Sequence, residues 1–363
     1  LSRWQTPPAV DPGGVEEVAT ETPGPLGEAL YDERLSELAG EPLDASTLGE
    51  AARAAAEAYG GRLSTLAAEL GSDDWRTLFA ELEKDHPPDR EAVLTAYREE
   101  VERQRRFLSP YDLFPWPEEP IQVIANDSPI FRRYFSLAMY LEGRLAVTLE
   151  PPDGGDPDAV AGYLVNHCHV CIPPLVAHEV APGHHVAYSA ANLLLPEGMA
   201  RLMAHRIHTV YHEGWGLYAE VLMLELGYYT TPAQRLGAVR LLYLRALRAS
   251  IDADLHRGAI SAQTAVERYR EEAGLLTAAA EIEVARHLKD PGLKASYFIG
   301  LRQLLSLRRH QLGDGPFDGE RDRVALGDFH RRLLGRPQPI PAIARERFDF
   351  PSGRPLFQGD SPY

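Results

Sequence analysis

Apolar residues recur at intervals of three and four over most of this 363-residue chain, and this periodicity constrains the fold most. It runs from "LGEALYDERLSELAG" to "DREAVLTAYREEVERQRRFL" and returns from Pro173 onward, with long helices expected around 232–257 and 294–312. In "DASTLGEAARAAAEAYGG" we expect one helix, capped by Asp44 or Ser46 and ended by its two glycines. The pattern predicts a mainly α-helical protein.

Three short runs rich in β-forming residues interrupt the helical pattern after Pro120. They are 121–125, 135–141 and 144–150, and Glu142-Gly143 separates the last two. We predict a small antiparallel sheet here. The chain then divides into an irregular lead-in at 1–25, a helical region at 26–118, and a region at 119–363 that holds the sheet (119–150) and the later helices. We expect the two larger regions to form one continuous domain.

The composition excludes several classes of protein. A content of 44% hydrophobic and 25% charged residues is that of a soluble globular protein. No run approaches ~18 apolar residues, so we expect no transmembrane helix. A net charge of −16 argues against nucleic acid or an anionic membrane surface as a partner. Two cysteines build no disulfide framework, which favours a cytoplasmic location.

Eight of the thirteen histidines fall between 167 and 212, around the stretch "HEVAPGHH". Many zinc hydrolases carry His-Glu-x-x-His on one helical face, but Pro182 occupies the position of the second histidine. On an ideal helix, residues six apart such as His178 and His184 are rotated by about 240°. Proline removes a helical hydrogen bond, so we interpret Pro182-Gly183 as a two-residue bulge inside the helix. Without that bulge His178 and His184 become the ligand pair, with His185 as the rival for the second position.

A third ligand is expected from "YHEGWGLYAE", residues 211–220. Glu213 and Glu220 are seven residues apart on an apolar, aromatic helix, so both can face inward, where a glutamate is costly unless paired or metal-bound. We predict Glu213 as a metal ligand and Glu220 as the acceptor that orients an imidazole N–H. Gly214 and Gly216 would allow another backbone to approach closely. The alternative is that both glutamates are exposed.

The blocks "HEVAPGHH", "EGWGLYAEVLMLELGYY", "QRLGAVRLLYLRALRASIDADLH" and "DPGLKASYFIGLRQLLSLR" resemble those of the domain-of-unknown-function 885 family. That family is considered similar to helical zinc metallopeptidases with a glutamate third ligand (gluzincins). The resemblance implies a mostly helical fold with a small sheet whose edge could hold an extended substrate. By position it marks the following residues: His178, Glu179, His184, His185, Glu213, Glu220, Asp252, His256, Tyr297, Phe329 and His330.

These positions imply a mechanism. Glu179 would be the general base, and Tyr297, His256 and His330 are candidate donors to the oxyanion, with Tyr297 preferred. Asp252, four residues before His256, could act with it. The family usually has lysine where Phe298 stands, so a contact with a substrate carboxylate would be lost.

The expected function is therefore a zinc-dependent hydrolase that cleaves a small peptide or related amide, with Fe²⁺ or Mn²⁺ as the alternative metal. Two histidines and one carboxylate could also hold non-haem iron in an enzyme of a biosynthetic pathway, and a non-catalytic metal-binding relative is the third possibility. Cys168 and Cys171 could be a redox pair, half of a zinc site, or two small buried residues. His208 and His212 could form a second metal pair or pack in the core.

Overall fold

The computed structural model describes residues 23–117, 120–128, 132, 137–151, 154, 157–194, 208–315, 317, 319–334 and 338–358. It is mainly helical, as predicted. The helices are α1 (Glu28–Ala39), α2 (Ala45–Glu69), α3 (Trp75–Leu82), α4 (Arg90–Leu108), α6 (Pro157–Leu164), α7 (Ile172–Glu179), α8 (His184–Leu194), α10 (Thr209–Glu225), α11 (Pro232–His256), α12 (Ala262–Ala273), α13 (Thr277–Lys289), α14 (Leu293–Leu312), α15 (Glu320–Leu333) and α16 (Ile340–Phe348), with a short 3₁₀ turn, η1 (Val165–His167).

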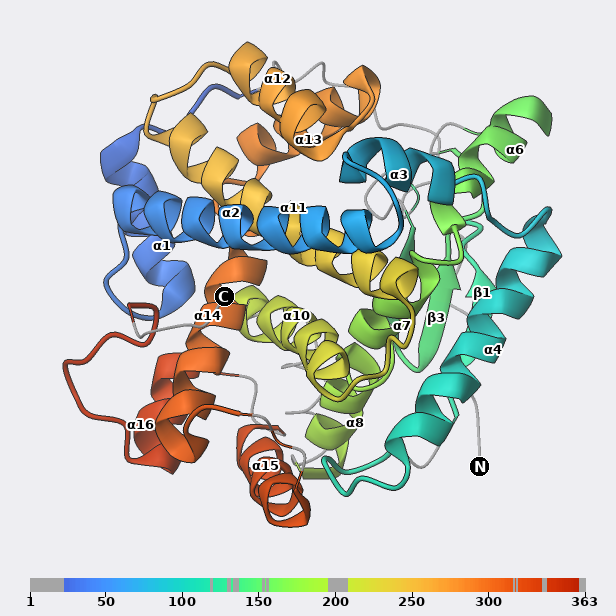
Figure 1. Cartoon of the computed structure of the whole chain (residues 1–363). Coiled ribbons are helices and arrows are strands. Elements are labelled where there is room, and N and C mark those ends of the chain that lie inside the picture. Colours follow the sequence, from blue (N-terminus) through green and yellow to red (C-terminus); the bar gives the residue numbers. More distant parts are fainter. Residues whose placement is uncertain are drawn as a thin grey trace, which may run out of the picture.

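Two long helices from distant parts of the chain, α2 and α11, lie side by side across one face of the molecule (Figure 1). The buried side of α2 is rich in alanine, and Gly49 lies against Ala253, to which a β-carbon on this glycine would be 3.5 Å away. Small side chains let two helix axes approach closely, so the N-terminal helical region packs directly on the later one. A single apolar core runs from Tyr31 to Phe357.

Helix boundaries follow the sequence signals with one exception. The Asp44 carboxylate accepts the backbone N–H of Thr47, which makes it the predicted cap of α2. The glycines at 60 and 61 do not end α2, which continues to Glu69 because Leu63, Leu66 and Ala67 still bury apolar surface. The helices predicted at 232–257 and 294–312 are confirmed as α11 and α14.

The sheet is mixed rather than antiparallel. Its order is β1 (Gln122–Ala125), β3 (Arg144–Val147), β2 (Ala138–Leu141), with β2 antiparallel and β1 parallel to β3. The turn at Glu142-Gly143 has positive φ at both residues, as a tight hairpin requires. The prediction was wrong for β1, which pairs in parallel with β3, the second strand of the hairpin. Strand composition alone does not reveal which strand will be the partner. Strand β2 lies at the edge and contacts α7.

Two of the predicted segments include residues that the structure does not describe. Residues 1–22 of the expected lead-in are not among the described ones, and neither are residues 135 and 136 of the second expected strand. Within the described part of the chain no single helix has the length and apolarity to cross a membrane; one bent helical pair, 160–167 with 172–193, satisfies those two criteria jointly.

Candidate metal centre

The proline-glycine pair separates two helices rather than forming a bulge within one. Helix α7 ends at Glu179 and α8 begins at His184, so the predicted continuous helix is wrong. The turn between them is tight: a β-carbon on Gly183 would lie 1.8 Å from the carbonyl oxygen of His178, so only glycine fits. The Trp215 indole N–H donates to the carbonyl oxygens of Pro182 at 2.9 Å and Gly183 at 3.1 Å. These bonds hold the turn against α10.

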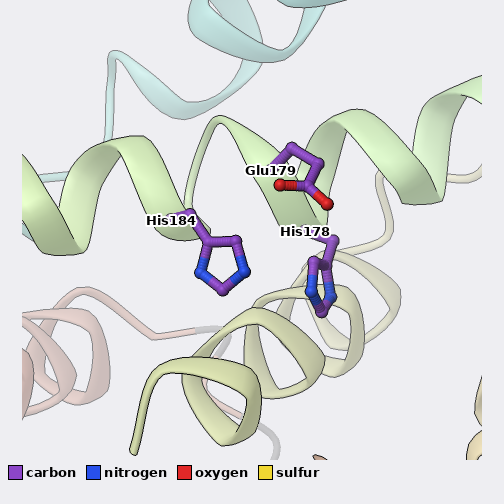
Figure 2. A group of neighbouring side chains, drawn as sticks. All are labelled: His178, Glu179 and His184. Carbon is purple, nitrogen blue, oxygen red and sulfur yellow. The ribbon is translucent and has the colours of Figure 1, made fainter. Parts of the chain in front are cut away.

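The turn nevertheless brings His178 and His184 together. Their ring centroids are 4.7 Å apart, and potential ligand atoms of His178, Glu179 and His184 all lie within 4.8 Å of one another. Figure 2 shows both imidazoles on the same side of the interrupted helix. All three side chains are buried. The rival ligand His185 is not in this group; its ring lies against Tyr140, with centroids 5.6 Å apart.

Glu213 on α10 completes a set of three potential ligands. Its Oε2 lies 3.4 Å from Nε2 of His178 and 3.6 Å from Nε2 of His184. Two ligands bound to zinc at about 2.1 Å with a tetrahedral angle are separated by about 3.4 Å. The spacing of these atoms therefore fits one small divalent cation.

Glu220, one further heptad along α10, lies behind His178. Its Oε1 accepts the Nδ1–H of His178 at 2.8 Å, and its side chain has no exposed surface. The two glycines of this helix have separate roles. A β-carbon on Gly216 would lie 2.5 Å from Cε1 of His178, and one on Gly214 would lie 2.5 Å from the Cα of Gly300 on α14. Gly216 thus makes room for the imidazole, and Gly214 for a helix crossing.

The carboxylates set the charge of this site. Burial opposes protonation of His178, but its hydrogen bonds with Glu213 and Glu220 outweigh burial and raise the pKa of the imidazole to about 10. Burial alone would raise the pKa of Glu213, but hydrogen bonds with His178 and His184 hold that pKa well below its usual value. The negative charge of the carboxylates stabilises the extra proton on His178. The same negative charge would stabilise a divalent cation bound instead of that proton.

Glu179, the predicted base, is fixed by the sheet. Its Oε2 accepts the backbone N–H of Tyr140 on β2 at 2.8 Å. The sequence predicts a strand at this position but gives no sign of this contact. Alternation along the strand shows which side chains share a face, but not which N–H groups point away from the neighbouring strand.

Tyr297 on α14 lies beside the histidines, as the resemblance implied. Its ring is stacked on that of His178, with centroids 6.0 Å apart. Burial raises the pKa of its phenol well above the usual value, and the negative charge of Glu213 adds to that effect. The next side chain, Phe298, points elsewhere: it is buried, with its ring 6.3 Å from that of Phe357. The expected loss of a substrate contact at position 298 is therefore not supported by this structure.

Asp252 and His256, which were predicted to act at the site, make their described contacts with other parts of the core. Asp252 accepts hydrogen bonds from the Tyr31 hydroxyl at 2.7 Å and from His287 Nδ1 at 2.6 Å. His256 Nδ1 accepts the N–H of Leu26, and its Nε2–H donates to the carbonyl of His287. Both side chains are fully buried and join α1, α11 and α13, which favours a structural role.

His330 is also displaced from the predicted role. Its Nε2 lies 2.8 Å from the Tyr218 hydroxyl, and its Nδ1–H donates to the carbonyl of Leu113 at 3.0 Å. Burial lowers the pKa of this imidazole to about 3, so it is neutral. Its ring packs edge-on against Trp215, 5.5 Å away. His330 therefore packs on the tryptophan that holds the turn, and these contacts favour a supporting role over that of an oxyanion donor.

The structure also bears on the alternatives predicted for the two cysteines and for the pair His208 and His212. Cys168 and Cys171 form a disulfide at the start of α7. His212 stacks on Tyr188 with centroids 4.7 Å apart, which favours the packing role over a second metal pair. Among the described side chains, the potential metal ligands that gather in a group of three are His178, Glu179 and His184, and Glu213 lies against both histidines of this group. His205, one of the clustered histidines, lies outside the described residues.

Comparisons with known proteins agree with the fold. A family model described as "Bacterial protein of unknown function (DUF885)" matches residues 12–339. No curated protein matches the chain.

Two solved structures have a similar fold, each with a TM-score of 0.74 and 20% sequence identity. One is described as a "putative lipoprotein" from Colwellia psychrerythraea, and 90% of this chain covers 57% of it. The other is described as a "putative lipoprotein of unknown function" from Shewanella oneidensis, and 89% of this chain covers 60% of it. The chain therefore spans less than two thirds of either structure.

Proposed function

The chain belongs to the bacterial family of unknown function DUF885, and on that premise we propose that it is a zinc-dependent hydrolase of peptide or related amide bonds. One observation carries this proposal. Two imidazole nitrogens converge on a single carboxylate oxygen at 3.4 and 3.6 Å, and a further buried carboxylate, Glu179, stands next to the first histidine. Zinc peptidases combine ligands and base in this way.

The donor set supports zinc over a harder cation. Two imidazoles and one carboxylate are the ligands zinc takes in catalytic sites with an open position, whereas Mg²⁺ and Ca²⁺ prefer oxygen alone. Nδ1 of His184 is buried and has no hydrogen-bond partner among the described residues, whereas Nδ1 of His178 is fixed by Glu220. A bound divalent metal would supply Lewis acidity and an acidified water molecule.

The protein's own side chains have distinct parts in such a reaction. Glu179 accepts a proton from the attacking water and passes it to the leaving amine; the Tyr140 N–H holds its carboxylate in place. Glu220 keeps the His178 ring in one orientation. Tyr297, whose ring stacks on that of His178, donates a hydrogen bond from its phenol to the developing oxyanion without adding charge.

Iron remains the alternative metal, because two histidines and a carboxylate also suit Fe²⁺. Glu179 favours hydrolysis, since a base next to the ligands has an evident role in hydrolysis and none in the iron triad.

The cellular location we propose differs from the cytoplasmic one expected from the number of cysteines. The disulfide at the start of α7 and the descriptions of the two similar structures favour a location outside the cytoplasm.

The first test is the bound metal. Wild type, His178→Ala and the control His169→Ala, whose side chain is 52% exposed, are purified and analysed by elemental mass spectrometry. We expect about one zinc per chain in wild type and control, and loss of zinc in His178→Ala. Iron in place of zinc would favour the redox alternative, and no metal after zinc is offered would refute the proposal.

The second test is turnover. A peptide library is offered to the zinc-loaded wild type and to Glu179→Gln, which keeps the shape of the side chain but cannot accept the proton. We expect Glu179→Gln to retain zinc and to lose about 10²–10⁴-fold in rate. Equal turnover by both proteins would rule out Glu179 as the base.

A further inference from the structure

Four cationic side chains on α11, α13 and α14 lie around Tyr297 and Glu283: Arg245 packs on the Tyr297 ring, and the other three contact Glu283. We call Arg245, Arg248, Arg286 and Lys294 the basic cluster. Three members of the cluster contact the same carboxylate, that of Glu283. Arg248 forms two hydrogen bonds of 2.7 Å with it, and Arg286 and Lys294 lie 3.6 and 3.7 Å from its oxygens. The cluster thus carries an excess of positive charge within a chain of net charge −16.

Arg245 is the member of the cluster that pairs with no carboxylate in the described part of the chain. It forms no ion pair with any described residue, and its Nε is buried without a hydrogen-bond partner. Its guanidinium carbon lies 5.0 Å from the centroid of the Tyr297 ring. A guanidinium offers five donors in a planar fork suited to a carboxylate. Burying part of it unpaired is costly, and a bound anion would remove that cost.

The state of Lys294 also reflects the excess charge. The pKa of its ammonium is lowered to about 7, mainly by burial and also by the positive charges of Arg248, Arg286 and Arg245, while the charge of Glu283 opposes this. The Lys294 side chain is only 13% exposed, so water does little to screen these repulsions. An anion in the cluster would reduce the repulsion among all four groups.

Tyr297 joins the basic cluster to the metal centre. The same ring contacts His178 at 6.0 Å and the Arg245 guanidinium at 5.0 Å. An extended peptide advances about 3.4 Å per residue. A carboxylate one or two residues beyond the bond to be cleaved can therefore reach Arg245.

We propose that Arg245 binds a carboxylate of the substrate, so that the preferred substrates are short peptides with a carboxylate one or two residues beyond the cleaved bond. This rests on the proposed hydrolase function. A free C-terminal carboxylate and an acidic side chain share this chemistry, and the test below separates them.

Binding is measured without turnover in zinc-loaded Glu179→Gln by calorimetry. Three probes of equal length are compared: an acetylated tripeptide with a free C-terminus, the same tripeptide amidated, and an amidated tripeptide ending in glutamate. The comparison is repeated with Arg245→Gln added. The control is Arg235→Gln, on the same helix α11, whose arginine pairs with Glu69 at 3.3 Å near the surface. Zinc content and thermal unfolding of each variant check that the fold is kept.

We expect a peptide carrying a carboxylate to bind at least about tenfold more tightly than the neutral amide, the range of one charge-assisted hydrogen bond. Arg245→Gln should abolish this preference, and Arg235→Gln should leave it unchanged. Preference for the free C-terminus, or for the glutamate peptide, identifies the source of the carboxylate. Equal binding of all three peptides, no binding of any, or a preference that survives Arg245→Gln would overturn the inference.

The two proposals fail separately. If wild type cleaves peptides but shows no preference for a carboxylate, the hydrolase function stands and the role of Arg245 falls. If the zinc-loaded variant prefers carboxylates through Arg245 but wild type cleaves nothing, the anion site stands and the hydrolase function falls.

Discussion

Replacing Gly216 by alanine tests the geometry of the metal centre without removing any polar group. The new β-carbon would lie 2.5 Å from Cε1 and 2.7 Å from Nε2 of His178. Carbon atoms in contact are normally at least about 3.5 Å apart, so the ring must move by about 1 Å. Metal–ligand distances tolerate only about 0.2 Å. Turning the ring instead would break its 2.8 Å bond to Glu220.

We therefore expect Gly216→Ala to weaken zinc binding by at least about 100-fold, the upper end of what loss of an orienting partner costs. Helix α10 itself should not suffer, because alanine is favoured over glycine inside a helix by about 0.5–1 kcal/mol. The matched control is Gly61→Ala in α2, where a β-carbon meets nothing within 4 Å. That variant should gain about 0.5–1 kcal/mol of stability and bind zinc normally.

The assay is a competition titration against a fluorescent zinc chelator, with denaturant unfolding of the zinc-free proteins measured in parallel. A zinc Kd for Gly216→Ala within about threefold of wild type, or 0.7 kcal/mol, would refute the reasoning. It would mean that the His178 ring does not lie against α10 as described.

Three other substitutions test separate parts of the structure. Glu220→Gln should weaken zinc binding by about 10–100-fold in the same titration, because an amide holds the His178 ring less firmly; unchanged affinity would exclude an orienting role. Asp252→Ala should lower the free energy of unfolding by about 3 kcal/mol or more, since it leaves buried donors unpaired, and it should keep its zinc; loss of zinc with an intact fold would return Asp252 to the site. Lys294 has a folded pKa of about 7, below its unfolded value, so the unfolded chain binds more protons between pH 7 and 10, and this residue makes stability rise with pH in that window. Lys294→Met should flatten that rise in denaturant unfolding from pH 7.5 to 9.5, and identical pH profiles would contradict the assignment.

Much of the candidate site follows from local sequence. A histidine followed by glutamate, a proline-glycine pair and two further histidines indicated a metal-binding turn, and the spacing of Glu213 and Glu220 placed both on the inward side of one helix. Local rules were sufficient because each of these motifs lies on one short element. They did not show whether Pro182 bends one helix or separates two, since both outcomes remove the same hydrogen bond.

The sequence alone determined the helical class, the position of the strands and the residues from which a metal centre could be built, because periodicity and capping are properties of neighbouring residues. Only the tertiary structure decided which polar side chains face that centre. His256 and His330 match the family pattern as well as Tyr297 does, yet they bond to backbone carbonyls elsewhere in the core. Tyr140 and Arg245 carry no sequence signal, and they reach the site because a strand edge and a helix from distant parts of the chain pack around it.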